Sequence, residues 1–173
     1  MLAFLAALLA APTSASAPVL DASVPWFERI TVTMDDKGAQ QSCKYQFSLS
    51  ASGPETCDAE MASTIPSVAA SGGAGLYSKL TFERRFSPGS KLDSGRVETG
   101  DKLLGQQVMF LTIGGDGSID SCRVVGTSGD LVPAYGCKEA RSEQFRVPAS
   151  APSEQPRQAF MTILVYGHQE QIA

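Results

Sequence analysis

The sequence contains a single histidine, His168, and no Cys-x-x-Cys pair among its four cysteines. Zinc sites need cysteines or histidines at short fixed spacings, so no metal site is predicted. The chain also lacks a Gly-x-Ser-x-Gly elbow, a phosphate-binding loop and a dinucleotide fingerprint. These absences argue against the common hydrolase and nucleotide-binding classes, and we expect no cofactor.

The remaining catalytic interpretation pairs a serine with the one histidine. Ser42, Ser121 and Ser128 are the candidate nucleophiles, and His168 is the candidate base. His168 follows the last apolar strand position and precedes a polar tail, which is typical of a solvated terminal residue, and no second base is available. We therefore predict that the protein is not an enzyme.

The chain has no basic surplus, and after its first residues it has no apolar run long enough to span a bilayer. Its net charge is −4, with 43% hydrophobic and 18% charged residues. An acidic balance does not fit a nucleic-acid-binding surface. The composition is that of an ordinary globular domain with a core of its own.

The first residues resemble a secretory leader. Residues 2–11 are almost purely Leu, Ala and Phe, and Pro12 and a run of small residues follow. An apolar run of about ten residues fits a signal-peptide core and is too short for a membrane-spanning helix. No Lys or Arg precedes it, and cleavage after Ala15 or after Ala17 stays open. We predict that residues 1–17 are a signal peptide, that the mature chain is periplasmic, and that it has no stable membrane insertion.

The even number of cysteines indicates disulfides in an exported chain. Cys43, Cys57, Cys122 and Cys137 allow three pairings, and composition alone does not choose among them.

An internal repeat does choose. Segments beginning at Ile30 and at Phe110 share an alternating apolar strand, an acidic-glycine turn, Ser-Cys and a basic residue, Ser-Gly, and a second Cys. The matching positions are 36–38 and 116–117, 42–44 and 121–123, 52–53 and 128–129, and finally Leu80 and Phe160, which stand at the same distance from the second Cys. The repeat predicts a first unit at 18–88, a linker at 89–102 and a second unit at 103–173.

Each unit is predicted to fold as β-β-α-β. A hairpin is followed by a helix, in the second unit from Val132 or Pro133 to about Gln144, and then by a final strand at 158–166. The expected class is α+β, with helices packed on one face of an antiparallel sheet. Disulfides within each unit, Cys43–Cys57 and Cys122–Cys137, would pin helix to hairpin. Closing a loop of about 15 residues is worth roughly 3 kcal/mol.

The later unit resembles the C-terminal domain of TonB-type energy transducers. The resemblance lies in residues 105–113, 116–119 and 122–129, and in 145–149, which match an aromatic-x-Pro-Ala segment. Cys122 and Cys137 match a known variant of the family with a Cys before the Val-x-x-Ser-Gly stretch and another in the helix. The resemblance covers about residues 103–167, and more faintly 28–88.

The resemblance implies a periplasmic domain that binds peptide segments of outer-membrane transporters by strand addition. An exposed sheet edge offers unpaired N–H and C=O groups to an extended partner. By position the candidate edge is the final strand, with Phe160, Thr162, Leu164 and Tyr166 on one face. The alternative left open is that these side chains pack in the core or in the seam between the units.

Departures from the family limit the prediction. No Tyr-Pro segment precedes Gly105, Leu131-Val132-Pro133 replaces the Leu-Asp pair, and prolines are scattered in place of a long spacer. We therefore predict a protein- or peptide-binding module without energy transduction of its own. The alternative is a structural envelope protein that keeps the fold but not the receptor-binding site. Pairing of two copies through an edge also stays open.

Overall fold

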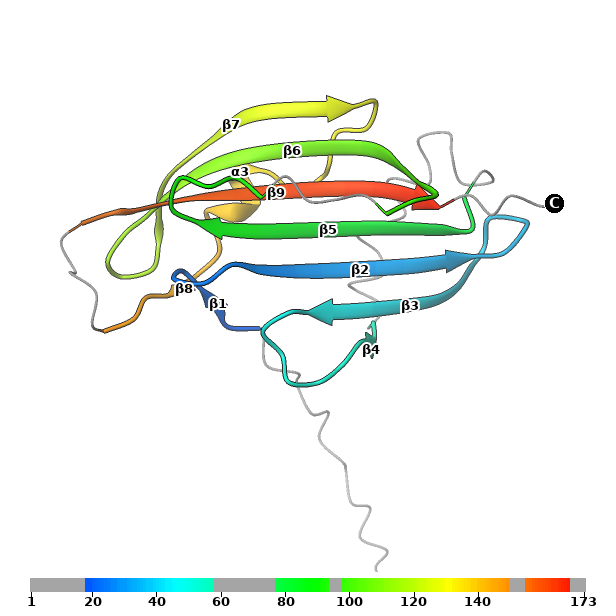
Figure 1. Cartoon of the computed structure of the whole chain (residues 1–173), viewed down its shortest axis with the longest axis horizontal. Helices are drawn as coiled ribbons and strands as arrows, with labels where there is room; N and C mark the ends of the chain where they lie inside the picture. The colour runs from blue at the N-terminus through cyan, green and yellow to red at the C-terminus, as the bar shows by residue number, and fades with distance from the viewer. Residues whose placement is uncertain (1–17, 58–76, 94–97, 150–154, 169–173) are drawn as a thin grey trace, which may run out of the picture.

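The chain builds one antiparallel sheet (Figure 1). The computed structural model describes residues 18–57, 77–93, 98–149 and 155–168. The sheet is seven-stranded, in the order β4-β3-β2-β5-β9-β6-β7. Its strands are β2 (Trp26–Met34), β3 (Gln40–Phe47), β4 (Glu55–Thr56), β5 (Lys79–Pro88), β6 (Asp101–Ile113), β7 (Ile119–Gly129) and β9 (Arg157–His168).

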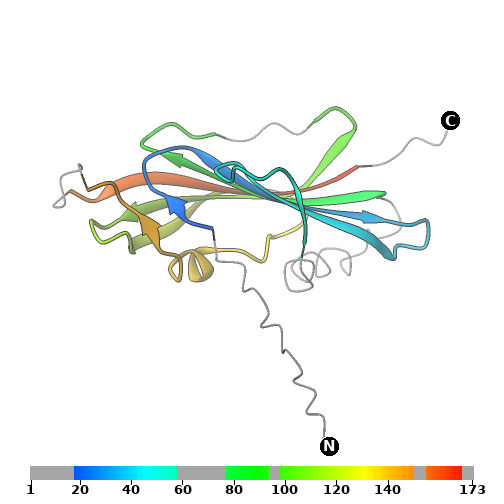
Figure 2. The ribbon, with the colours of Figure 1, turned by 90° about the horizontal axis from the view of Figure 1, so that it is seen from below.

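Small elements lie on one side of this sheet (Figure 2). Strand β1 (Leu20–Asp21) pairs in parallel with β8 (Phe145–Arg146), and α3 (Cys137–Ala140) is a single helical turn. None of the helices formed by the described residues is long and apolar enough to cross a membrane.

The acidic-glycine turns close the two long hairpins, as predicted. Asp35 and Asp116 each accept hydrogen bonds from main-chain N–H groups two residues further on, which fixes the turn. Gly38 and Gly117 adopt positive φ values of 77° and 85°. Hydrogen bonds lower the pKa of both carboxyl groups. The largest lowering comes from the Ala39 main-chain N–H at Asp35 and from the Ser118 hydroxyl at Asp116.

The two halves of the sheet repeat one arrangement. The first half has the order β3-β2-β5 and the second the order β7-β6-β9, and β5 pairs with β9 in the middle. The equivalent residues follow from the register, in which Val32 faces Cys43 and Leu80 while Leu111 faces Cys122 and Ala159. In this equivalence Arg84 matches Ile163, and these two residues face each other across the seam. An approximate two-fold axis therefore passes between them.

The prediction of an α+β fold with helices packed on one face is wrong. The described residues form a mostly β structure, with a seven-stranded sheet, a two-stranded sheet and no helical layer. The predicted helix from Val132 or Pro133 to Gln144 shrinks to one turn, because Gly136 is extended, with φ −141° and ψ −162°, and the helix begins only at Cys137. The helix-prone stretch after Cys57 and the predicted leader lie outside the described residues.

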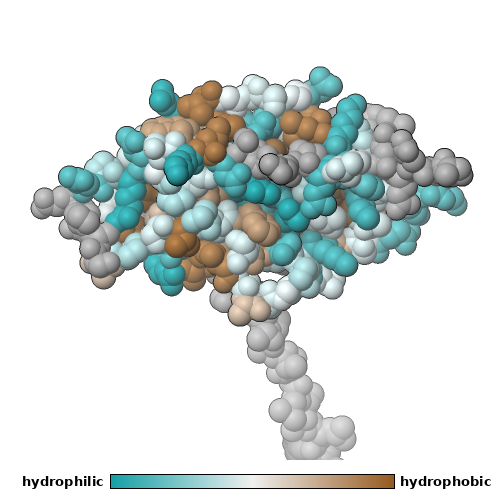
Figure 3. Space-filling model, viewed as in Figure 1, coloured by the Kyte–Doolittle hydropathy of each residue, from teal (hydrophilic) through white to brown (hydrophobic). Residues whose placement is uncertain are grey.

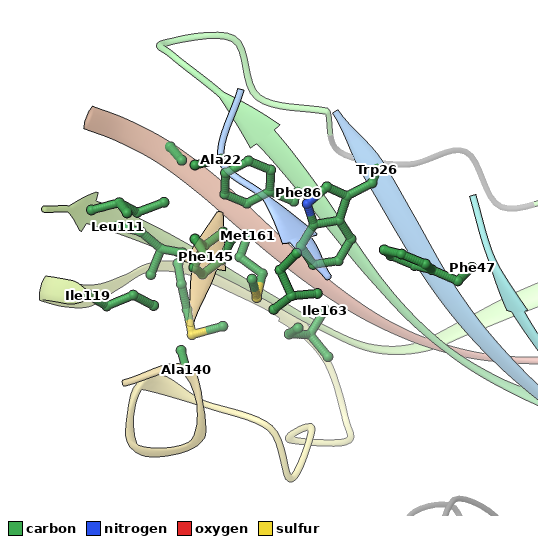
Figure 4. Packing of buried hydrophobic residues seen from close by; sticks show 14 residues of the cluster. Ala22, Trp26, Phe47, Phe86, Leu111, Ile119, Ala140, Phe145, Met161 and Ile163 are labelled. Carbon is green, nitrogen blue, oxygen red and sulfur yellow. The ribbon is translucent and has the colours of Figure 1, made fainter. Parts of the chain in front are cut away.

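The main core lies between the sheet and the segment 130–149 (Figure 4). Trp26 stacks on Phe86 with ring centroids 5.3 Å apart and meets Phe47 edge to face. Its Nε1–H donates to the carbonyl of Asp21 at 3.0 Å, so Trp26 fastens the chain entering β2 to β1. Phe145 of β8 packs against Phe86 at 5.1 Å. Aromatic contacts of this kind add to the burial energy.

The connection between β5 and β6 crosses the opposite face of the sheet. Both strands are antiparallel to β9, which lies between them, so the chain must return along the whole length of the sheet. At Asp93 this connection touches the sheet: its carbonyl accepts the Thr162 hydroxyl at 3.2 Å, and its N–H donates to Ser87 at 3.3 Å. The predicted linker 89–102 is thus a crossover within one sheet, and its last residues, Asp101 and Lys102, already belong to β6.

Strand β8 lies against the β6–β7 turn at Gly117, and a substitution there tests how close the approach is. A Cβ at Gly117 would lie 1.9 Å from the carbonyl oxygen of Phe145, whereas one at Gly89, which also has positive φ, would meet nothing within 4 Å. We expect Gly117→Ala to lower the free energy of unfolding by about 3 kcal/mol and Gly89→Ala by only about 1 kcal/mol. Urea unfolding measures both, and equal losses would contradict the close approach.

Asp21 anchors β1 through an unusually acidic carboxyl group. Ser23 donates to it from N–H and hydroxyl, and Arg146 Nη2 donates at 2.6 Å. Although burial raises the pKa of Asp21, these hydrogen bonds outweigh burial and lower it to about 2.

This lowered pKa predicts acid sensitivity. Because the folded-state pKa lies below the unfolded value, the stabilisation is complete above about pH 4 and is lost as the pH falls towards 2. We expect Asp21→Asn to remove about 2 kcal/mol of stability at pH 6 and little at pH 2. Thermal unfolding across this range decides it. A difference between variant and wild type that does not change with pH would refute the assignment.

Candidate functional site

The strand predicted as the binding edge lies in the centre of the sheet. β9 pairs along one side with β5 and along the other with β6. Of the four candidates, Thr162, Leu164 and Tyr166 are buried and Phe160 is half-buried against Phe110. The prediction of an edge strand at 158–166 is wrong. Strand β9 ends the second half, and β5 of the first half pairs with the side of β9 that would otherwise be open.

The candidate catalytic residues do not meet. His168 Nδ1 lies 2.7 Å from Asp101 Oδ1, and the hydroxyl of Ser128 bonds to Gln106 Oε1 at 3.0 Å. Ser42 lies on β3 and Ser121 on β7, on opposite halves of the sheet. In the described ranges no three His, Cys, Asp or Glu side chains gather to hold a metal ion.

The open edge of the sheet is β7, an 11-residue strand at the top of Figure 1. Within the described part of the chain it pairs only with β6. Val124 and Val125 stand 47% and 46% exposed on it, which is unusual for large apolar side chains in a strand. An exposed edge of this length is a template for adding an extended segment.

The opposite edge, β3, is covered at the equivalent position. Strand β4 lies antiparallel beside it, with Glu55 opposite Tyr45 and Thr56 opposite Lys44. Cys57 N–H donates to the carbonyl of Cys43 at 3.3 Å, so Cys43 and, two residues on, Tyr45 direct their main-chain groups outward.

The equivalence of the two halves then identifies the outward groups of β7. Cys43 and Tyr45 correspond to Cys122 and Val124, because Val32 and Leu111 occupy the same register position. Arg141 Nη2 reaches the Cys122 carbonyl at 3.5 Å, consistent with an outward direction. The N–H and C=O of Val124 have no such partner among the described residues.

Two bulges limit the usable length of this edge. The β6–β7 register shifts between Thr112 and Ile113 and again between Val108 and Met109. The regular stretch of β7 therefore lies between these shifts, at residues 121–124. It is here that a partner strand meets an undistorted ladder.

A disulfide and a helical turn support this stretch from beneath. Cys122–Cys137 joins β7 to α3, and Cys43–Cys57 joins β3 to the residue after β4. These are the pairings that the repeat predicts. The segment between the cysteines returns along the edge in the first half, whereas in the second half it passes below the sheet. The equivalent disulfides therefore hold a strand against the β3 edge in the first half and leave the β7 edge open in the second.

Arg84 holds that lower segment in place. Its guanidinium is buried on the core face, pairs with Glu28, donates to Glu143 at 2.5 Å and to Tyr135 at 3.1 Å, and lies over the ring of Trp26. Burial alone lowers the pKa of Arg84, but the carboxylates of Glu28 and Glu143 raise it above its usual value. A permanent buried cation therefore ties β5 and β2 to the segment under β7.

A second charged group occupies the opposite face. Glu83 is 1% exposed and receives Arg29 Nε at 2.5 Å, Arg85, and the Tyr166 hydroxyl at 3.1 Å. Figure 3 views this face, on which apolar side chains form separate groups among hydrophilic ones. The described apolar side chains in this view are separated by hydrophilic ones, whereas β7 presents a row of main-chain groups, so we take the β7 edge as the candidate site.

Sequence reasoning assigns the residues of this edge to a hairpin strand and not to a binding site. Nothing in the local pattern of residues 122–129 marks them as an edge. The usable signal is the difference between the two copies: after Ser-Gly, the first continues as Pro-Glu-Thr-Cys and the second as Asp-Leu-Val-Pro. Comparison with protein-family models, with curated proteins and with solved structures finds no match.

Hydrogen exchange tests which side of β7 is open. We expect the amide proton of Val124 to exchange about 100-fold faster than that of Arg123, whose N–H points into the ladder, and faster than that of Tyr45, which β4 covers. Nuclear magnetic resonance of the labelled full chain measures all three. Equal protection of Val124 and Arg123 would mean that the outer side of β7 is already occupied.

Proposed function

We propose that this protein is an exported, non-enzymatic binding module that takes up an extended segment of a partner protein along β7. The observation that carries this proposal is the open outer side of β7, with exposed Val124 and Val125, beside an equivalent edge that β4 covers. Main-chain hydrogen bonds would supply affinity, and side chains on alternating faces would supply specificity.

Two features support the proposed export to an oxidising compartment. Residues 1–17 have the composition of a signal peptide, and both pairs of cysteines are joined in disulfides. Disulfides of this kind persist in oxidising compartments such as the periplasm. The resemblance of residues 103–167 to TonB-type C-terminal domains favours outer-membrane transporters as the source of the partner segment. No energy transduction is proposed for this chain.

One observation favours the alternative, a structural envelope protein without a receptor site. Native proteins often use bulges to discourage pairing at sheet edges, and β7 carries two register shifts. In that case the edge is protected and has no partner. The two functions differ in whether anything pairs with residues 121–124.

A proline at Val124, whose N–H points away from the sheet, distinguishes the binding module from the structural protein. Val124→Pro removes the outward N–H, and proline is tolerated in edge strands where the N–H faces solvent. Val124→Ala, the matched control, keeps that N–H and shortens the side chain. A photo-crosslinker at Val125 in intact Gram-negative cells is expected to capture a partner in the wild type and in Val124→Ala. In Val124→Pro the yield should fall about ten-fold or more.

The same crosslinker at Leu49, an exposed apolar residue beyond β3, is the positional control. Crosslinks that survive Val124→Pro, or that form equally well from Leu49, would sink the strand-addition mechanism and leave the structural alternative. Circular dichroism of each variant confirms that the fold is intact.

A further inference from the structure

In the first half of the sheet a short strand, β4, pairs with the outer side of β3, and the described residues add no such strand to β7 in the second half. On β3, the segment Glu55–Thr56 lies antiparallel, with Thr56 opposite Lys44 and Glu55 opposite Tyr45. The equivalent positions on β7 are Arg123 and Val124. We infer that β7 binds an extended, acidic peptide segment with the same antiparallel main-chain register as β4, but with the carboxylate one position along, opposite Arg123, and an apolar, β-branched residue opposite Val124. This inference rests on the proposed function and specifies its ligand.

The register follows from the main chain. An added antiparallel strand exchanges hydrogen bonds only with residues whose N–H and C=O point outward, which on β7 are Cys122 and Val124. The first half uses the equivalent Cys43, which accepts from Cys57 at 3.3 Å. Arg123 then lies between the two bonded positions, where opposite side chains approach most closely.

The charge of the ligand follows from Arg123. This side chain is exposed, lies over the ring of Phe110 at 5.3 Å, and forms no salt bridge within the described residues. Lys138 of α3 and Arg141 lie on the other, core-facing side of this edge, where Arg141 reaches the Cys122 carbonyl, so Arg123 is the cation of the face away from the core. Glu139, the acidic residue of this turn, accepts the N–H of Gly136 at 2.9 Å. A carboxylate opposite Arg123 completes a cross-strand ion pair.

The apolar requirement follows from Val124. It stands opposite Met109, which is completely buried, so its side chain is on the core-facing side of the sheet. Nearly half of it is exposed. A β-branched residue directly opposite covers that surface and suits an extended conformation. Tyr45 is the larger counterpart in the first half, and there Glu55 lies opposite.

Three capped peptides provide the test. Each has the pattern threonine, valine, X, valine, threonine, with glutamate, glutamine or lysine at X, and is titrated into the labelled full chain. We expect amide shifts at residues 121–125. The glutamate peptide should bind about three-fold tighter than the glutamine peptide and about ten-fold tighter than the lysine peptide.

Arg123→Gln is expected to abolish this order, and Lys44→Gln, the equivalent change on the covered edge, to leave it intact. Equal binding of all three peptides at β7 would overturn the acidic ligand and leave strand addition standing. If no peptide shifts residues 121–125, both the inference and the proposed function fall. Shifts at β7 that grow with protein concentration, without peptide, would identify a second copy of the chain as the occupant and overturn the peptide ligand.

Discussion

The ladder between β5 and β9 is the constraint on which the rest of the molecule depends. Each half, taken alone, ends in a strand with one bare side, and pairing these two strands satisfies both at once. This seam turns two small sheets into one and buries the middle of β9 completely. It also decides which edge of the sheet stays open, because the inner strands pair with each other and β7 remains as the long terminal strand of the described residues.

Arg84 makes that seam asymmetric. The approximate two-fold axis sets it opposite Ile163, so one half contributes a buried cation where the other contributes an aliphatic side chain. Breaking a buried ion pair leaves an uncompensated charge, which costs far more than the pair gains over an apolar replacement. Glu28 comes from the first half, while Glu143 and Tyr135 come from the second. Separating the halves would leave Arg84 paired with Glu28 alone and remove Glu143 and Tyr135, so these two contacts of Arg84 favour one way of joining the halves.

Local features of the fold are predictable from the sequence, and its long-range pairings are not. The turns at Asp35 and Asp116 follow from short patterns, and the pairing of both disulfides follows from the internal repeat. The repeat aligns Leu80 with Phe160, but the register matches Leu80 with Ala159, because the extra residue between Cys122 and Cys137 shifts the count by one. A slip of one residue changes the face of the sheet. The helix predicted after Pro133 is wrong because Gly136 is extended and only one turn follows it. The predicted binding edge is wrong because strand order depends on contacts distant in sequence.

The central position of β9 has a consequence for how the chain is made. Residues 157–168 are synthesised after both of their neighbours, and until they arrive β5 and β6 face each other across a gap that nothing fills. Such non-local pairing makes folding slow and late. The two halves therefore cannot join into one sheet before β9 has formed, because the only strand that links β5 to β6 is the last of the three along the chain.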